Sequence, residues 1–244
     1  MLLQHVYFIV ILYFLIGAIS IFFINRKGKN ISENKERWLK YVVYLAVVNI
    51  VIEAILHDNE LRLVAIAILL LGLYEIVSAW LNVREGRVIQ LISALVIYSI
   101  VAFGFWHYAI LQSASNKLYV YLLVFVFDGF CQISGQLFGK HKLSPNVSPN
   151  KTIEGLLGGY IITIVTCVAL SKDFGFSLAQ VFILSTVLCI AALTGDLAAS
   201  YYKRICKIKD YSKIIPGHGG VLDRFDSFIV AGAVFYFLNY FHLV

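Results

Sequence analysis

The sequence predicts an all-α, polytopic integral membrane protein with about eight transmembrane helices and a polar cavity that faces the cytoplasm. Three observations favour this class. Hydrophobic residues fill 60% of the 244 positions, charged residues only 14%, and the mean hydropathy is +0.83. Soluble domains carry about 25% charged residues. The remaining polar residues gather between apolar runs that are long enough to cross a bilayer.

A helix that crosses a bilayer needs about 20 mostly apolar residues. No basic residues precede the first apolar run, so we expect a retained helix there and not a cleaved signal peptide. The second and sixth runs are short, which leaves tilted, extended or re-entrant arrangements open. The predicted helices span residues 5–25, 41–56, 61–82, 88–110, 118–138, 155–170, 177–195 and 225–243.

The basic residues predict the orientation. Four connections hold 6, 2, 3 and 6 of the 20 Lys and Arg side chains; they are 26–40, 83–87, 139–154 and 196–224. Eight helices place all four on one side, which the positive-inside rule makes cytoplasmic, with both termini opposite. The net charge of +6 then reflects topology and attraction to the lipid bilayer, and no nucleic-acid partner is expected.

Two of these connections hold most of the polar residues that could perform chemistry. In residues 195–227, Asp196 ends one predicted helix, while Asp223 and Asp226 open the next and share a helical face. Carboxylates without clustered His or Cys suit Mg²⁺, which we expect Asp196 and Asp223 to hold. Simple helix capping is the alternative for these acids.

Cations and glycines accompany the acids. Lys203 and Arg204 follow Asp196, an arrangement that polyphosphate handling requires. Gly219 and Gly220 permit close backbone approach to phosphate oxygens, and His218 between glycines could bond a phosphate. No Walker A or GxGxxG pattern is present.

The companion connection, residues 135–155, contains "SPNKTIEG". Ser148, Lys151 and Thr152 suit phosphate contacts, and the same letters also predict a turn followed by a helix start. Asp128 lies deep within the fifth apolar run, where a carboxylate needs a polar cavity or a partner. Glu53 and Glu75 raise the same question, with a buried interhelical contact as the alternative.

These residues resemble the phosphatidate cytidylyltransferase family over about residues 118–244. The family signature Ser-x-x-Lys-Arg, Lys-Asp, His-Gly-Gly and Asp-Arg-x-Asp is matched by Ser200, Lys203, Arg204, Lys209, Asp210, His218, Gly219, Gly220, Asp223, Arg224 and Asp226. A second pattern is matched by Asp128, Gly135, Gly139, Lys140, Ser148, Pro149, Lys151, Thr152, Glu154 and Gly155. The first half, residues 1–117, matches only as N-terminal transmembrane helices, so residues 118–244 form the expected catalytic half with two active-site loops.

The resemblance implies a reaction in which CTP and phosphatidate give CDP-diacylglycerol and pyrophosphate. It implies Mg²⁺ and a nearby monovalent cation such as K⁺ as cofactors. The expected catalytic residues are Asp196, Lys203, Arg204, His218, Asp223 and Arg224. The expected substrate-binding residues are Asp128, Lys140, Ser148, Lys151, Thr152, Ser200, Lys209, Asp210, Gly219, Gly220 and Asp226. The expected location is a bacterial plasma membrane, with the active site facing the cytoplasm and a homodimer left open.

Two other functions remain open at this point. One is a sister activity: a CTP-dependent lipid kinase, or a cytidylyltransferase for a different lipid phosphate. The other is a transporter of an anionic lipid or solute, against which the concentration of polar residues at one membrane face argues.

Overall fold

The computed structural model describes residues 2–27, 31–83, 88–217 and 219–243, and within them the chain is almost entirely helical. The helices are α1 (Leu2–Lys27), α2 (Ile31–Leu56), α3 (Asp58–Leu81), α4 (Val88–Leu111), α5 (Ala114–Phe138), α6 (Ile153–Ala169), α7 (Ser171–Phe174), α8 (Leu178–Ile205) and α9 (Leu222–Tyr240). Two short strands, β1 (Lys142–Ser144) and β2 (Ser148–Thr152), pair as an antiparallel hairpin between α5 and α6.

Six helices among the described residues are long and apolar enough to cross a membrane: α1, α2, α3, α4, α5 and α8. Helix α6 is apolar but has only 17 residues. Helix α9 carries Asp223, Arg224 and Asp226 in its first two turns, and the rest of it is apolar. The prediction of a helical multi-pass membrane protein is therefore confirmed at the level of six such helices.

Several helices extend beyond their predicted limits. Helix α2 starts at Ile31 and not near residue 41, and α8 continues to Ile205 and not to residue 195. The prediction that Asp196 ends its helix is wrong, because Asp196, Lys203 and Arg204 all belong to α8. Apolar runs mark the part of a helix that lies in hydrocarbon, whereas hydrogen bonding continues through polar turns outside it.

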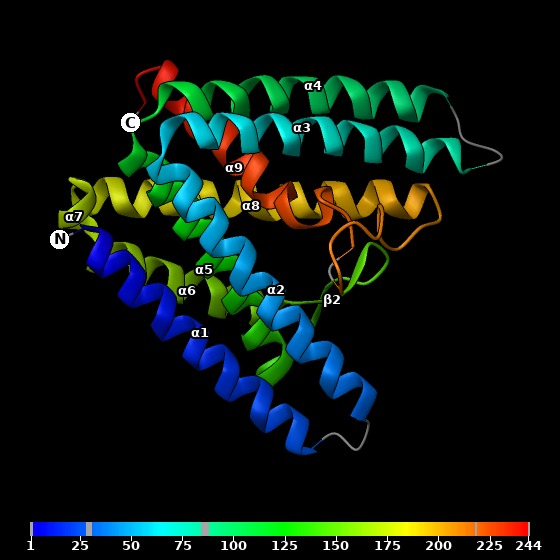
Figure 1. Cartoon of the computed structure of the whole chain (residues 1–244), viewed down its shortest axis with the longest axis horizontal. Helices are drawn as coiled ribbons and strands as arrows, with labels where there is room; N and C mark the ends of the chain where they lie inside the picture. The colour runs from blue at the N-terminus through cyan, green and yellow to red at the C-terminus, as the bar shows by residue number, and fades with distance from the viewer. Residues whose placement is uncertain (1, 28–30, 84–87, 218, 244) are drawn as a thin grey trace.

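Helix α5 forms the centre of the molecule. It is the most buried of the six long apolar helices and contacts α1, α2, α6, α8 and α9. Helices α8 and α9 pack against one another, and α3 and α4 form an outer pair of which α4 covers α9 (Figure 1). Because α5 contacts both α8 and α9, Asp128 comes near residues that lie far along the chain.

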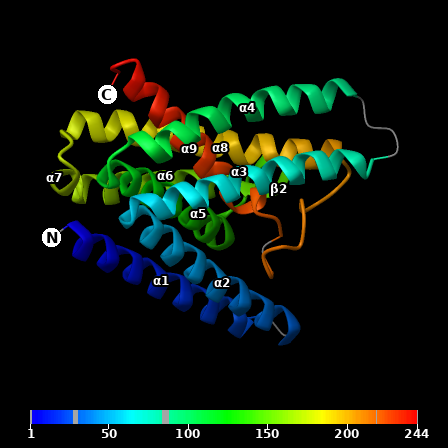
Figure 2. The same ribbon diagram turned by 45° about the horizontal axis from the view of Figure 1, so that its top comes forward.

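The polar connections lie at one end of the molecule. In Figures 1 and 2 the hairpin, the loop 206–221, the end of α3 and the start of α2 all lie at that end, while both termini and α7 lie at the other. This arrangement follows from the alternating direction of long helices. It gathers the segments that hold the predicted site residues.

Candidate active site

One face of α8 presents a line of polar side chains. Asp196, Ser200 and Lys203 stand at positions i, i+4 and i+7, which an α-helix brings onto the same side. The Ser200 hydroxyl donates to Asp196 Oδ1 over 3.2 Å. Both Ser200 and Lys203 are buried, so this polar face is turned toward neighbouring helices.

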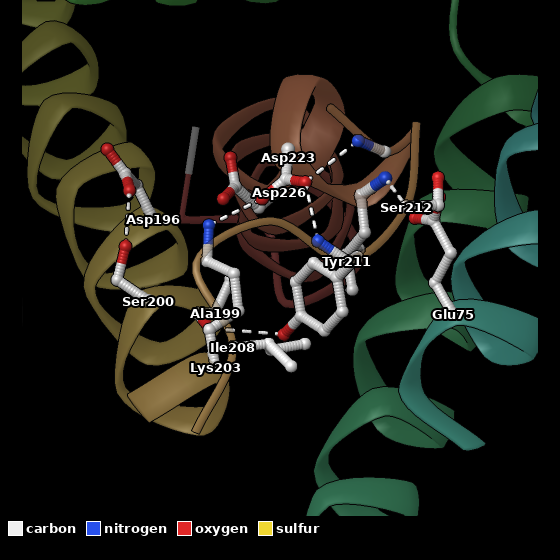
Figure 3. Close-up of polar contacts among 12 residues, drawn as sticks. Glu75, Asp196, Ala199, Ser200, Lys203, Ile208, Tyr211, Ser212, Asp223 and Asp226 are labelled. Atoms are coloured by element: carbon white, nitrogen blue, oxygen red, sulfur yellow. Dashed lines mark hydrogen bonds and ion pairs between the residues drawn. The ribbon is translucent and has the colours of Figure 1, made fainter. Parts of the chain in front are cut away.

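Lys203 reaches from α8 to the first turn of α9. Its Nζ lies 2.5 Å from Asp223 Oδ1, and the two side chains are 10% and 2% exposed (Figure 3). The same ammonium lies 5.4 Å from the centre of the Tyr211 ring. Removal of one partner of such a buried ion pair strongly destabilises the folded protein, because the other charge then stays buried and unpaired.

The second oxygen of Asp223 organises the loop before α9. Asp223 Oδ2 accepts hydrogen bonds from the backbone N–H of Tyr211 at 2.9 Å and of Gly220 at 2.8 Å. Burial raises the pKa of Tyr211, whose hydroxyl donates to the carbonyl of Ala199. Asp223 therefore ties the loop to both α8 and α9.

Three other carboxylates repel one another electrostatically beside this pair. The charge of Asp196 repels those of Asp128 on α5 and Asp226 on α9. Asp226 accepts a hydrogen bond from the backbone N–H of Ser227 at 2.7 Å, and the Ser227 hydroxyl hydrogen-bonds to Asp128. The sequence separates Asp128 from the other two by more than 60 residues, and the packing of α5, α8 and α9 brings the three together.

The hairpin contributes cations and backbone contacts to the same place. Lys151 on β2 forms an ion pair with Asp196, and both side chains are about one quarter exposed. Arg204 is exposed, and its Nε donates to the carbonyl of Val147 over 3.1 Å. These two contacts join the two predicted active-site loops.

The companion loop is held by its own hydrogen bonds. Thr152 caps α6, since its hydroxyl accepts from the N–H of Gly155, and it is buried. The backbone N–H of Lys140, followed by the His141 ring, lowers the pKa of the Glu154 carboxyl to about 2. The predicted helix start at this point is confirmed, but Ser148 to Thr152 form a strand where the sequence suggested a turn.

The remaining predicted residues lie around this centre with different exposure. The side chains of Lys140, Lys209, Asp210 and Arg224 are exposed, Ser148 and Gly219 are half-buried, and Gly220 is buried. Arg224 still acts electrostatically on Asp128. His218 lies outside the described residues.

The hydrogen-bond partners and the mutual repulsion of the carboxylates indicate which of them could bind a cation. Among the described residues, no three His, Cys, Asp or Glu side chains stand close enough to enclose a metal ion. Asp223 already has both oxygens engaged by Lys203 and two backbone amides. Asp196, Asp226 and Asp128 instead repel one another, and a cation among them would relieve that repulsion.

The sequence singled out Glu75 as an acid in an apolar run but gave it no partner. In the structure Glu75 on α3 is fully buried and accepts hydrogen bonds from Ser212, Val221 and Leu222. Sequence reasoning missed Tyr211, a loop residue whose ring lies beside the Lys203 ammonium, and no sequence pattern marks it.

Comparisons with known proteins identify the family of this chain. The model of the cytidylyltransferase family matches residues 1–242. A protein of Rickettsia typhi named phosphatidate cytidylyltransferase is 31% identical over 230 residues, which cover 88% of this chain and 97% of that protein.

Two staphylococcal proteins of the same name align over a smaller part of their length. That of Staphylococcus haemolyticus is 44% identical over 46% of this chain, and that of Staphylococcus saprophyticus is 35% identical over 71% of it. These alignments span 44% and 66% of the two staphylococcal proteins.

Proposed function

The chain belongs to the cytidylyltransferase family, and from this premise we propose that it transfers a cytidylyl group from CTP to phosphatidate. The products are CDP-diacylglycerol and pyrophosphate. One observation carries the proposal: two ion-paired lysines, Lys151 and Lys203, lie beside carboxylates that repel one another where α8 and α9 approach the hairpin. The choice of phosphatidate as the lipid acceptor rests on relatives that are named phosphatidate cytidylyltransferase.

The reaction joins two anions. An oxygen of the lipid phosphate attacks the α-phosphorus of CTP, and the bond to the β-phosphate breaks, so negative charge develops on the leaving pyrophosphate. The lipid phosphate is already ionised near neutral pH, so the reaction needs no strong general base. The task of the protein is to align the two phosphates and to offset their repulsion.

Lysine and arginine side chains of the two loops would reduce the repulsion between the two phosphates. Lys151 is partly exposed and forms an ion pair with Asp196, a carboxylate that repels Asp128 and Asp226, so it can exchange that contact for a phosphate. Arg224 and Lys209 are exposed and free to turn toward the triphosphate. Lys203 is held in place by Asp223 and fixes the position of α9 relative to α8.

The expected Mg²⁺ would relieve the repulsion between Asp196 and its neighbours Asp226 and Asp128, and because these three side chains do not enclose an ion by themselves, phosphate oxygens of CTP would complete its ligand shell. The sequence alone assigned Asp196 and Asp223, but the contacts of Asp223 argue for a role in loop organisation. When bound, Mg²⁺ would neutralise charge on the triphosphate and on pyrophosphate. The same oxygen-rich group of side chains would accommodate a monovalent cation such as K⁺.

The proposed enzyme acts at the cytoplasmic face of a bacterial plasma membrane. Helices α6 and α9 would complete eight spans with the six long apolar helices, and the loop side would be cytoplasmic by the positive-inside rule. CTP would then reach the site from solution and phosphatidate from the bilayer.

The test is a turnover assay of the purified protein in detergent micelles with phosphatidate, radiolabelled CTP and Mg²⁺. We expect label in a CDP-lipid together with release of pyrophosphate. Release of CDP with a newly phosphorylated lipid would instead identify a kinase. Absence of any lipid product across varied lipids and cations would overturn the proposal and favour a transporter.

A further inference from the structure

Glu75 is an acidic side chain inside the apolar helix α3. It belongs to the N-terminal half, far in sequence from the loops with the predicted site residues, and it is 0% exposed. A carboxylate buried at such a place is costly unless hydrogen-bond donors compensate it. Its partners therefore indicate what the residue does.

All the described partners of Glu75 lie in the segment from Ser212 to Leu222. Its Oε1 accepts from the Ser212 hydroxyl at 2.6 Å and from the N–H of Val221 at 2.9 Å. Its Oε2 accepts from the N–H of Leu222 at 2.7 Å. An ionised carboxylate only accepts hydrogen bonds, so it suits three donors at once.

The two amides belong to the first residues of α9. Val221 is the N-cap of that helix and provides no capping side chain, so Glu75 satisfies donors that the helix itself leaves open. Its negative charge also stands at the positive end of the α9 dipole. Glu75 thus caps α9 from another helix.

The Glu75 carboxylate also explains why position 220 of the signature needs a glycine. A Cβ built on Gly220 would collide with Glu75 Oε1 and would lie 2.8 Å from Oε2. Any larger residue at position 220 would push the carboxylate away from the α9 amides. Gly220 and Glu75 therefore form one fitted contact between the two halves of the chain.

We infer that Glu75 is a positioning residue for the proposed cytidylyl transfer, an inference that rests on the proposed function. It holds Ser212 at one end of the loop (Figure 3). It also holds Val221 and Leu222 at the other end. Between these points Asp223 binds the amides of Tyr211 and Gly220 and pairs with Lys203. Glu75 therefore acts through the loop and α9, which also carry Asp226 and Arg224.

The first experiment compares the full-length wild type with Glu75→Gln, which keeps the side-chain shape but replaces one accepting oxygen by an NH₂ group. We expect kcat to fall on the order of 10²-fold, as for a misplacement near 1 Å, with KM values for CTP and phosphatidate changed less than about threefold. Glu53→Gln is the matched control, since Glu53 also lies in an apolar helix and accepts a hydrogen bond, from Tyr7, away from the loop. Its kinetics should equal those of the wild type.

A double variant separates loop positioning from general damage. If Ser212 acts through Glu75, Glu75→Gln with Ser212→Ala should lose little more than Glu75→Gln alone. Additive losses, a kcat of Glu75→Gln within threefold of wild type, or an equal loss in Glu53→Gln would each overturn the inference. Thermal unfolding verifies that every variant is folded at the assay temperature.

Limited trypsin digestion in detergent gives a readout that does not depend on turnover. Lys213 is exposed next to Ser212, and cleavage after it should accelerate at least about tenfold in Glu75→Gln but not in Glu53→Gln. Equal cleavage rates in all three proteins would overturn the loop-holding role. If the wild type made no CDP-lipid, the proposed function would fail while the digestion still decided whether Glu75 holds the loop.

Discussion

Neighbouring aspartates of the signature have different surroundings. Both are buried, but Asp223 accepts three hydrogen bonds from Lys203 and the loop, whereas Asp226, one helical turn later, accepts one from the backbone N–H of Ser227 and is repelled by the charges of Asp196 and Asp128. The sequence shows two acids at i and i+3 and does not show which of them receives donors from the loop. The structure therefore separates the aspartate that organises the loop, Asp223, from the one that we assign to the proposed cation site, Asp226.

This difference predicts opposite effects of two isosteric substitutions. Asp226→Asn removes one of three repelling charges, so it should leave thermal stability unchanged or raised and reduce turnover about 10³-fold. Asp223→Asn leaves Lys203 buried without its counter-charge and should lower the free energy of unfolding by about 3–5 kcal/mol.

Thermal unfolding and CDP-lipid formation across a Mg²⁺ titration measure both effects. Near-normal turnover of Asp226→Asn would remove that residue from the proposed cation site. A thermal stability of Asp223→Asn equal to wild type would contradict the buried ion pair.

At the scale of elements, the hairpin depends on one carboxylate. Glu154 accepts from the backbone of Lys140 and His141, which holds its pKa near 2, below the 4.5 of a free glutamate. Stability from this contact is present in full above pH 4.5 and is lost as the pH falls toward 2. Glu154→Gln should therefore lower the melting temperature at pH 6 more than at pH 3.

The measurement is thermal unfolding of both proteins in detergent over that pH range. Glu60→Gln, at an exposed position of α3, serves as the control for the loss of one surface charge. A Glu154→Gln effect that is independent of pH would mean that the contact does not depend on the ionised carboxylate.

Two glycines predict how closely α5 and α6 pack. A Cβ on Gly159 would lie 2.9 Å from the Phe127 carbonyl and would collide with Cys131, whereas a Cβ on Gly129 would meet nothing within 4 Å. Gly159→Ala should destabilise the protein by about 1–3 kcal/mol. Gly129→Ala should be neutral or stabilise by up to about 1 kcal/mol.

Thermal unfolding in detergent compares the two glycine variants with wild type. Equal melting temperatures would show that the helices can separate without cost. Gly155 and Gly159 have the GxxxG spacing that is typical of close helix packing, and a Cβ on either glycine would collide with Cys131 of α5.

For the whole molecule, the sequence predicted a helical multi-pass membrane protein, because each membrane-crossing helix needs a continuous apolar run. Among the described residues, six of the eight predicted spans correspond to helices long and apolar enough to cross a membrane. It did not predict the polar helical turns at 31–40 and 196–205 or the hairpin, since these lie outside the apolar runs and depend on tertiary contacts. Within the candidate site, it named acids and cations but did not predict which of them form ion pairs. The contact of Glu75 with the loop joins residues 137 to 147 positions apart, a separation that no local pattern reveals.

The arrangement of connections predicts the sidedness of the molecule. A cysteine replacing Asn150 on the hairpin should react with a membrane-impermeant reagent from the cytoplasmic side alone, and one replacing Lys172 on α7 from the other side alone. Both positions are exposed. The wild type, whose four cysteines are buried or half-buried, gives the background labelling. Labelling of both variants from one side would contradict eight spans.

The polar face of α8 has a consequence for how the length of the chain can vary. Asp196 and Lys203 are seven residues apart on one uninterrupted helix, so about 10 Å of rise and two turns separate them. One extra residue between them would swing Lys203 by about 100° around the helix axis and away from Asp223. We therefore expect that functional variants of this chain carry no insertion or deletion between residues 196 and 203, because this stretch of α8 fixes the distance from the Asp196 carboxylate to the Lys203–Asp223 ion pair.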